Sequence, residues 1–152
     1  MQVSGGRFLV IGGAGFIGSH VVDQLLAGGA AHVRVYDNFS RGKRENLTQA
    51  LTDPRAEIFA DGGDILHFDT LLKAMEDMDG VFHLAALWLL QCHEYPRSAF
   101  DVNVAGTMNV IEAVIASGVK KLVFSSSASV YGDAVAEPMD EDHAFNCQEF
   151  YG

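Results

Sequence analysis

Three glycines near the amino terminus have the spacing of a phosphate-binding turn. Gly12, Gly15 and Gly18 lie in the stretch GGAGFIGSH, directly after the short apolar run FLVI at residues 8–11. The first glycine lets the chain turn sharply, the second lets backbone N–H groups approach a diphosphate, and the third lets a helix pack closely on a strand. Unpaired N–H groups at the start of that helix favour an anion. The spacing therefore predicts a site for the diphosphate of a dinucleotide.

An aspartate after the second predicted strand completes this pattern. Asp37 lies 19 positions after Gly18, where a carboxylate can accept hydrogen bonds from both ribose hydroxyls of an adenosine. The same carboxylate would repel the additional phosphate of NADP, so we expect NAD, although the nearby Arg41, Lys43 and Arg44 weaken that choice. The alternative is an ordinary glycine turn followed by a solvated strand end or helix cap at Asp37. The strand, turn and helix order favours the cofactor.

Hydroxyl side chains gather after the last predicted strand, in the stretch KKLVFSSS at residues 120–127. Three serines at a strand end could be no more than turn residues. Ligands of open α/β sheets, however, bind beyond the carboxyl ends of the strands. The stretches GGAG and HLAA also follow predicted strands, so we expect three strand ends to converge on one crevice.

Alternating strands and helices must position these groups. The apolar patterns predict strands at 8–11, 32–36, 57–60, 80–86 and 120–127, and helices at 16–26, 68–75 and 98–117. Such alternation predicts an α/β fold with a doubly wound parallel sheet, the Rossmann arrangement, in a single domain over residues 1–152. The acidic segment 133–148 is predicted as loop, and a further helix could begin at Glu149.

Composition excludes several classes of function. Ten Lys and Arg against 20 Asp and Glu give a net charge of −10, which argues against nucleic acid as a partner. We see neither a membrane-spanning segment nor a secretory signal, and therefore expect a cytoplasmic protein with no membrane partner. Cys92 and Cys147 are then expected to be reduced thiols. His143 and Cys147 have no matching second pair of ligands, so we expect no metal site.

A series of motifs in order resembles the extended short-chain dehydrogenase/reductase family, specifically the NAD-dependent sugar-nucleotide epimerases and dehydratases of the UDP-glucose 4-epimerase type. The motifs are GGAGFIGSH at 12–20, YDNFSRGKREN at 36–46, GDI at 63–65, HLAA at 83–86, DVNVAGTMNVIEA at 101–113, VFSSSASVYG at 123–132 and FYG at 150–152. The resemblance covers nearly the whole chain and is more specific for family than for substrate.

The resemblance implies a role for individual residues. Ser127 matches the catalytic hydroxyl of the family and Tyr151 its acid/base, which takes a sugar hydroxyl proton while a hydride moves to NAD. Asp64 and Ile65 would flank the adenine, and Asn103 would brace the site from within its helix. The cofactor-binding set implied by the resemblance and by the glycine turn is Gly12, Gly15, Phe16, Ile17, Asp37, Asn38, Ser40, Asp64, Ile65, Leu84, Ala85, Ala86, Asn103 and Ser125.

The family also implies what should follow these residues. Its tyrosine base is supported by the nicotinamide ring and by a lysine four residues later, one helical turn away. That position falls beyond Gly152, so we expect this chain to be the amino-terminal half of a longer enzyme and inactive alone. The sheet would then be incomplete at its carboxyl-terminal edge, with the strand KLVF exposed and liable to pair with another chain. We therefore expect a homo-oligomer, a dimer in the simplest case.

The sequence leaves alternatives within and beyond the enzyme class. Dehydratases of the family place an acidic pair near the catalytic hydroxyl, and SASVYG offers none, so we expect an epimerase of a nucleotide-activated sugar. A dehydratase or reductase, or an NAD-binding regulator without turnover, remains the alternative. In LWLLQCHEYP, Leu87, Trp88, Leu89 and Leu90 could line the ligand pocket or be buried against a partner or the remaining half; the second interpretation is favoured.

Overall fold

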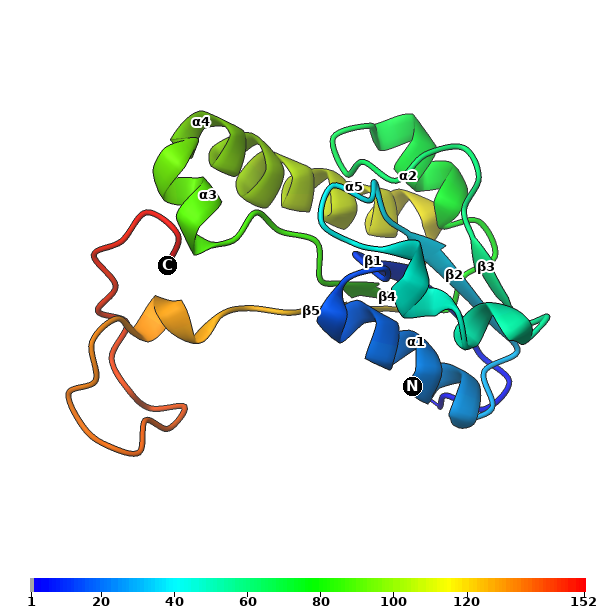
Figure 1. Cartoon of the computed structure of the whole chain (residues 1–152), viewed down its shortest axis with the longest axis horizontal. Helices are drawn as coiled ribbons and strands as arrows, with labels where there is room; N and C mark the ends of the chain where they lie inside the picture. Colours follow the sequence, from blue (N-terminus) through cyan, green and yellow to red (C-terminus); the bar gives the residue numbers. More distant parts are fainter. Residues whose placement is uncertain (1) are drawn as a thin grey trace.

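A computed structural model describes residues 2–152 and shows a parallel sheet with helices on both faces (Figure 1). Its strands are β1 (Arg7–Ile11), β2 (His32–Tyr36), β3 (Ala56–Ile58), β4 (Gly80–His83) and β5 (Lys121–Phe124). Their order is β3-β2-β1-β4-β5, with every neighbouring pair parallel. The predicted doubly wound Rossmann arrangement is confirmed. Because the strand order reverses at β1, the turn after β1 lies at the switch point, where ligands of such sheets bind.

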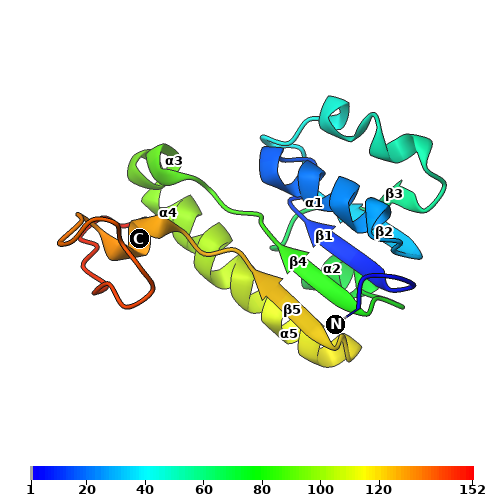
Figure 2. The same ribbon diagram turned by 90° about the horizontal axis from the view of Figure 1, so that it is seen from below.

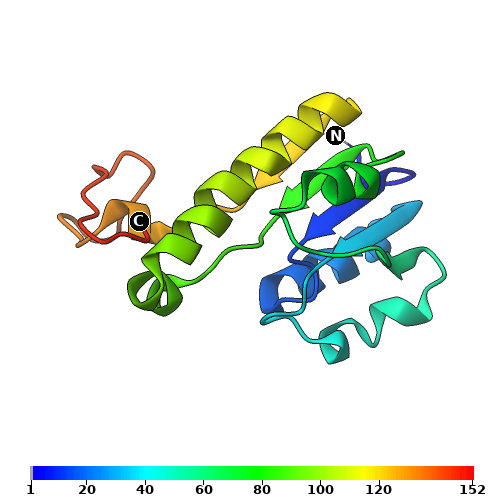
Figure 3. The same cartoon turned by 90° about the horizontal axis from the view of Figure 1, so that it is seen from above.

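The helical elements cover the two faces of the sheet unequally. They are α1 (Phe16–Ala27), the 3-10 turns η1 (Arg44–Leu47) and η2 (Ala50–Thr52), α2 (Phe68–Ala74), α3 (Leu89–Glu94), α4 (Pro96–Ala99), the π-helical stretch η3 (Phe100–Gly106), α5 (Thr107–Ser117) and the 3-10 turn η4 (Ala128–Tyr131). Figures 2 and 3 show α1 on one face, with α2 and α5 on the other. The segment after β5 extends beyond the carboxyl end of the sheet.

The central strand β1 is buried on both sides. Phe8 and Val10 belong to the core cluster beneath α1, whereas Leu9 and Ile11 belong to the cluster beneath α2 and α5. All four side chains are fully buried, which explains why this strand shows no alternation of apolar and polar residues. Each buried side chain of this kind contributes about 1.5–3 kcal/mol to stability. Strand β1 is therefore the fixed element from which the turn at Gly12 starts.

Two predicted strands end three residues earlier in the structure. The strand predicted at 80–86 stops with β4, although the N–H of Leu84 still donates to the Ile11 carbonyl at 2.9 Å. Beyond that point β1 has turned away at Gly12 and offers no further backbone partner. Strand β5 ends early, at Phe124, for the same reason, because its neighbour β4 has ended. The residues released from the sheet become the loops that face the switch point.

The helices differ from the prediction in three places. Helix α3 was not predicted, because six residues between an apolar loop and Pro96 carry too little periodicity. The helix expected at 98–117 begins at Pro96 and contains the π-helical stretch η3, a feature often found at functional sites. The described residues 149–152 form a turn rather than the start of a helix.

The helical run Pro96–Ser117 is long and apolar enough, by length and composition alone, to cross a membrane. In the fold its residues Val110 and Ala113 are fully buried in the core cluster that contains Leu9 and Val81. Helix α5 also packs against α2. A core helix of a globular domain passes the same test, so this run gives no argument for a membrane span.

His83, the last residue of β4, is a polar side chain in the core. It is fully buried, its Nε2 lies 3.0 Å from the Thr107 hydroxyl, and its ring packs 5.3 Å from that of Phe124. Its Nδ1 has no hydrogen-bond partner in the part of the chain that the structure describes. Burial lowers the pKa of His83 to about 4, so the imidazole is neutral at physiological pH.

This histidine should make stability depend on pH. With an unfolded pKa near 6.5 and a folded pKa of about 4, the unfolded chain takes up a proton that the folded chain refuses, so stability falls as pH drops from 6.5 toward 4. We expect about 1 kcal/mol of this loss between pH 6 and pH 5. Urea unfolding of the wild type and of His83→Phe at both pH values measures the difference. Equal losses in the two proteins would contradict the assignment.

Candidate functional site

Two glycines at the turn between β1 and α1 are packed so closely that no side chain would fit in their place. Gly12 has a φ of +78°, and a Cβ added to it would lie 2.8 Å from the backbone nitrogen of Ala85 in the loop after β4. A Cβ added to Gly18 would collide with the carbonyl oxygen of Gly12. The first glycine thus brings the loops after β1 and β4 together, and the third seats α1 on the turn. The spacing predicted a sharp turn at the first glycine and close helix packing at the third, which the structure shows, whereas the diphosphate site stays a prediction.

Both backbone polar groups of Ala14, its N–H and its carbonyl, form hydrogen bonds with residues of the segment that follows β2. The Ala14 N–H donates to Oδ2 of Asp37 at 2.9 Å. Its carbonyl accepts from the side-chain amide of Asn46 at 2.8 Å and from the N–H of Lys43 at 3.0 Å. Because Ala14 is also fully buried, the middle of the glycine turn is held in one conformation.

The amino terminus of α1 opens toward solvent. Gly15 caps it with no side-chain hydrogen bond, so the first-turn N–H groups are left without an intrahelical or capping acceptor. Phe16 and Ile17 in the first turn of α1 are 80% and 61% exposed, respectively, so they are not packed in the core. An open row of N–H groups without a Cβ at Gly15 fits a diphosphate, since it supplies donors, a positive helix end and room for the ligand.

Asp37 stands beside this turn and is held from both sides. Besides the bond from Ala14, its Oδ1 accepts from the N–H of Phe39 at 2.8 Å. Each carboxylate oxygen keeps further acceptor capacity for a ribose hydroxyl. The next residues form a tight turn in which Oδ1 of Asn38 accepts from the N–H of Ser40 at 3.0 Å, and both are exposed. The structure thus places all three predicted residues at the end of β2.

Asp64 and Ile65 are placed by contacts from two other elements. The hydroxyl of Tyr36, at the end of β2, donates to the Asp64 carbonyl at 2.8 Å. The Ile65 side chain is buried in the core, and its carbonyl accepts from the side-chain amide of Asn109 in α5 at 3.0 Å. Burial and the charge of Asp64 raise the pKa of Tyr36 to about 12, so it stays a donor. This loop lies next to the end of β2, as a role near adenine requires.

The loop after β4 is held by Asn103 from the π-helical stretch. Leu84 is partly buried, and Ala85 lies against Gly12 with Ala86 following it. Leu87, the residue after Ala86, is held at both of its backbone polar groups by the side chain of Asn103. Oδ1 of Asn103 accepts from the Leu87 N–H at 2.7 Å, and Nδ2 of Asn103 donates to the Leu87 carbonyl at 2.9 Å. The amide therefore has the specific partner that its apolar helix demanded. It braces the loop.

The predicted catalytic residues lie beyond β5 in a separate cluster. Ser125 is exposed, and the hydroxyl of Ser127 accepts from the N–H of Ser129 at 3.2 Å, capping η4. The residue after Tyr151 lies against the Ser129 carbonyl and the Cys147 thiol, so the chain terminus returns to η4. Figure 2 shows this cluster at the carboxyl end of the sheet, the same end as the glycine turn. Within residues 2–152, no hydrogen bond joins the cluster to that turn.

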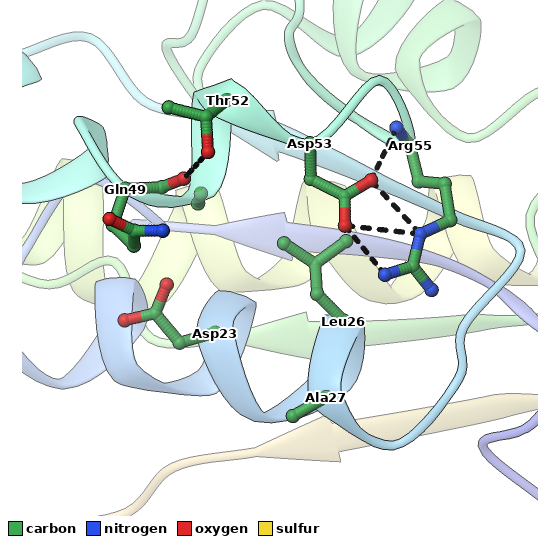
Figure 4. Close-up of a pocket in the computed structure, with 8 residues that line it drawn as sticks. Asp23, Leu26, Ala27, Gln49, Thr52, Asp53 and Arg55 are labelled. Carbon is green, nitrogen blue, oxygen red and sulfur yellow. Dashed lines mark hydrogen bonds and ion pairs between the residues drawn. The ribbon is translucent and has the colours of Figure 1, made fainter.

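A surface hollow elsewhere does not fit the predicted chemistry. It lies between the carboxyl-terminal end of α1 and η2, so it is at the opposite end of α1 from the glycine turn (Figure 4). Its charged groups are Asp23 and the pair of Asp53 and Arg55, whose guanidinium holds the pKa of the Asp53 carboxyl at about 2. Since Asp53 and Arg55 bind each other, they present no free charge for a ligand.

Sequence reasoning missed the residues that hold the site together. Ala14, Asn46 and Asn109 were not singled out, although Asn46 closes the motif YDNFSRGKREN and Asn109 lies in DVNVAGTMNVIEA. An asparagine inside an apolar helical stretch needs a partner, which was the usable signal for Asn109 as it was for Asn103. On the Ala14 side these hydrogen bonds use backbone groups, so the type of that residue gives no signal of them.

The chain is similar to known proteins over most of its length. A family model described as the 3-beta hydroxysteroid dehydrogenase/isomerase family matches residues 9–150. A UDP-glucose 4-epimerase of Lacticaseibacillus casei is 41% identical over 135 residues, covering 87% of this chain and 38% of the relative. The UDP-glucose 4-epimerase of Brucella ovis, solved with NAD, is similar with a TM-score of 0.84 at 32% identity, covering 96% of this chain and 43% of that one.

A dehydratase gives a similar match. DesIV, a dTDP-glucose 4,6-dehydratase from Streptomyces venezuelae solved with NAD bound, has a TM-score of 0.87 at 33% identity, covering 95% of this chain and 47% of its own. The chain spans less than half the length of the curated relatives it matches. It belongs to the 3-beta hydroxysteroid dehydrogenase/isomerase family, among the extended short-chain dehydrogenases/reductases that include the NAD-dependent sugar-nucleotide epimerases and dehydratases.

Proposed function

We propose that this chain binds NAD and forms the cofactor-binding part of an NAD-dependent epimerase acting on a nucleotide-activated sugar. The observation that carries the proposal is the open turn before α1, where Gly12 and Gly18 leave no space for side chains and the Asp37 carboxylate is hydrogen-bonded to Ala14. This arrangement offers backbone donors for a diphosphate and a carboxylate for a ribose next to each other. The NAD-bound relatives of similar fold support it.

The proposed cofactor contacts follow the placement of the residues. The glycine turn and the first turn of α1 hold the diphosphate, Asp37 with Asn38 and Ser40 holds the adenosine ribose, and Asp64 with Ile65 flanks the adenine. The loop after β4 and Ser125 line the path toward the nicotinamide, with Asn103 fixing that loop through Leu87. When bound, NAD supplies the hydride acceptor for the sugar carbon.

The proposed chemistry of the chain itself is proton transfer. Tyr151 takes the proton of the sugar hydroxyl and returns it, and Ser127 donates a hydrogen bond to the same oxygen. Support comes from the cluster that brings the residue after Tyr151 to η4, which Ser127 caps. A phenol acts as a base near neutral pH only beside positive charge, and the family pattern supplies it from the cofactor and from a lysine four residues later.

The choice of an epimerase rests on the residues around Ser127. SASVYG contains no acidic pair, which dehydratases of the family place there, and several of the curated relatives are UDP-glucose 4-epimerases. A dehydratase remains the second candidate, because DesIV matches the fold equally well. An NAD-binding regulator would need neither Ser127 nor Tyr151.

The same proposal covers organisation and location. We propose that residues 1–152 are the dinucleotide-binding domain and that the groups completing the sugar site lie outside them, as the greater length of the relatives supports. A cytoplasmic location is part of the proposal. It is supported by the free thiols of Cys92 and Cys147 and by the packing of the apolar run Pro96–Ser117 as a core helix.

The cofactor assignment predicts a preference that depends on Asp37. The wild-type chain should bind NAD at least about tenfold more tightly than NADP, because the carboxylate accepts ribose hydroxyls and repels the additional phosphate. Asp37→Asn keeps an acceptor for Ala14 but loses the charge, so NAD affinity should fall by about tenfold, as for a lost charge-assisted hydrogen bond. Calorimetry measures both. Asp23→Asn, at the far end of α1, is the matched control, and tighter binding of NADP would refute the role of Asp37.

Turnover by this chain alone should be undetectable. With NAD and UDP-glucose, chromatography should show no 4-epimer beyond the protein-free reaction, because the positive charge that a tyrosine base needs is only partly supplied within residues 1–152. If the epimer does form, the chain is sufficient by itself and this part of the proposal is wrong. Tyr151→Phe then tells whether the activity belongs to this site, since it should remove a general base worth about 100-fold or more.

We also propose that the chain associates with itself. Strand β5 is an edge of the sheet, and its Val123 and Phe124 are 39% and 54% exposed, so its backbone groups and apolar side chains are open to a second chain. Sedimentation should show dimers or larger species whose fraction rises with concentration. Val123→Lys, which charges the edge, should shift the distribution toward monomer; a wild type that stays monomeric at high concentration excludes the association.

A further inference from the structure

A cation–π contact joins the loops after β2 and β4. The guanidinium carbon of Arg41 lies 4.7 Å from the centre of the Trp88 ring. Both side chains are exposed, and Trp88 is 41% exposed. Neither residue belongs to the predicted set of site residues, and the charge of Arg41 was expected only to weaken the preference for NAD over NADP.

The position of this pair follows from the order of the strands. Strand β1 lies between β2 and β4, so a contact between the loops that leave β2 and β4 must pass over the carboxyl end of β1. That end carries Gly12 and the glycine turn. Gly42, the residue after Arg41, packs against Ala14, and Ala85, three residues before Trp88, packs against Gly12, so the Arg41–Trp88 pair lies beside the glycine turn.

Both loops are fixed next to the pair. On the Arg41 side, the N–H of Lys43 and the amide of Asn46 are bonded to the Ala14 carbonyl. On the Trp88 side, the preceding peptide of Leu87 is bonded twice by Asn103. Each residue of the exposed pair is therefore next to a hydrogen-bonded segment. The fold, and not only the cation–π contact, holds the pair beside the turn.

The charge of Arg41 is available to a ligand. Within residues 2–152 it forms no ion pair and no side-chain hydrogen bond, although the chain carries 20 acidic residues against 10 basic ones. Its guanidinium lies on the indole and forms no ion pair with the Asp37 carboxylate, which accepts from the N–H groups of Ala14 and Phe39. A guanidinium stacked on an aromatic face keeps its N–H edges free for phosphate oxygens.

We propose that Arg41 is a ligand of the cofactor diphosphate bound at the glycine turn, and that Trp88 is the positioning residue that holds its guanidinium there. This inference rests on the proposed binding of NAD. It places Trp88 at the ligand site. For the stretch LWLLQCHEYP, the sequence alone favoured the alternative, which is burial against a partner or the remaining half.

The chain provides its own probe, because Trp88 is its only tryptophan. ADP, which carries the diphosphate, should change the Trp88 emission of the wild type, and adenosine should not. Arg41→Met should weaken ADP and NAD binding by about tenfold, the worth of one charge-assisted hydrogen bond, and leave adenosine binding within twofold of wild type. Trp88→Leu should weaken ADP binding about threefold, the worth of an exposed cation–π contact, as measured by calorimetry.

Arg44→Met is the matched control, since it removes an exposed arginine from the same loop that contacts no aromatic ring; it should bind ADP as the wild type does. If Arg41→Met binds ADP as tightly as the wild type, or loses as much affinity for adenosine as for ADP, the inference about Arg41 is overturned. The proposed binding of NAD would not be affected by either result. A wild-type chain that binds neither NAD nor ADP would overturn the proposed function as well. Circular dichroism of each variant confirms that the fold is retained.

Discussion

The backbone of the turn after β1 is the constraint on which the rest of the structure depends. Gly12 leaves no space for a side chain against Ala85, and Gly18 leaves none against Gly12, so the loops after β1 and β4 and the start of α1 are packed as bare backbone. The Ala14 peptide is then bonded to the loop after β2 at both its N–H and its carbonyl. Three segments separated in sequence are thus packed and hydrogen-bonded together next to the amino terminus of α1.

Around this point the fold holds each loop with an amide or hydroxyl from a neighbouring element. Asn103 fixes the loop after β4, Asn109 and Tyr36 fix the loop containing Asp64, and Asn46 fixes the glycine turn. These side chains bind main-chain groups, so the loops keep their own side chains free for a ligand. In a chain with a net charge of −10, any attraction for a diphosphate must be local, and we propose that the backbone donors at the amino terminus of α1 and the guanidinium of Arg41 supply it.

Much of the fold was predictable because its signals are local. The apolar run FLVI predicted a strand buried on both faces, and Gly12, Gly15 and Gly18 predicted a strand, turn and helix unit; both are confirmed. The ends of β4 and β5 were not predictable, since each strand stops where its neighbour does. The strand order, which brings the loops after β2 and β4 over the glycine turn, is likewise a property of the sheet. The bonds to Ala14 and Leu87 and the stacking of Arg41 on Trp88 follow from it.

The most direct test of the account is to observe the backbone amides of the turn while NAD is added. In two-dimensional ¹H–¹⁵N NMR spectra, the amides from Gly13 to Ile17 should show the largest shifts, since the turn and first helical N–H groups are the proposed donors to the diphosphate. ADP should shift the same amides and adenosine should leave them nearly unchanged. If NAD binds while these amides stay where they are, with shifts gathered instead around the hollow beside Asp23, the account is contradicted.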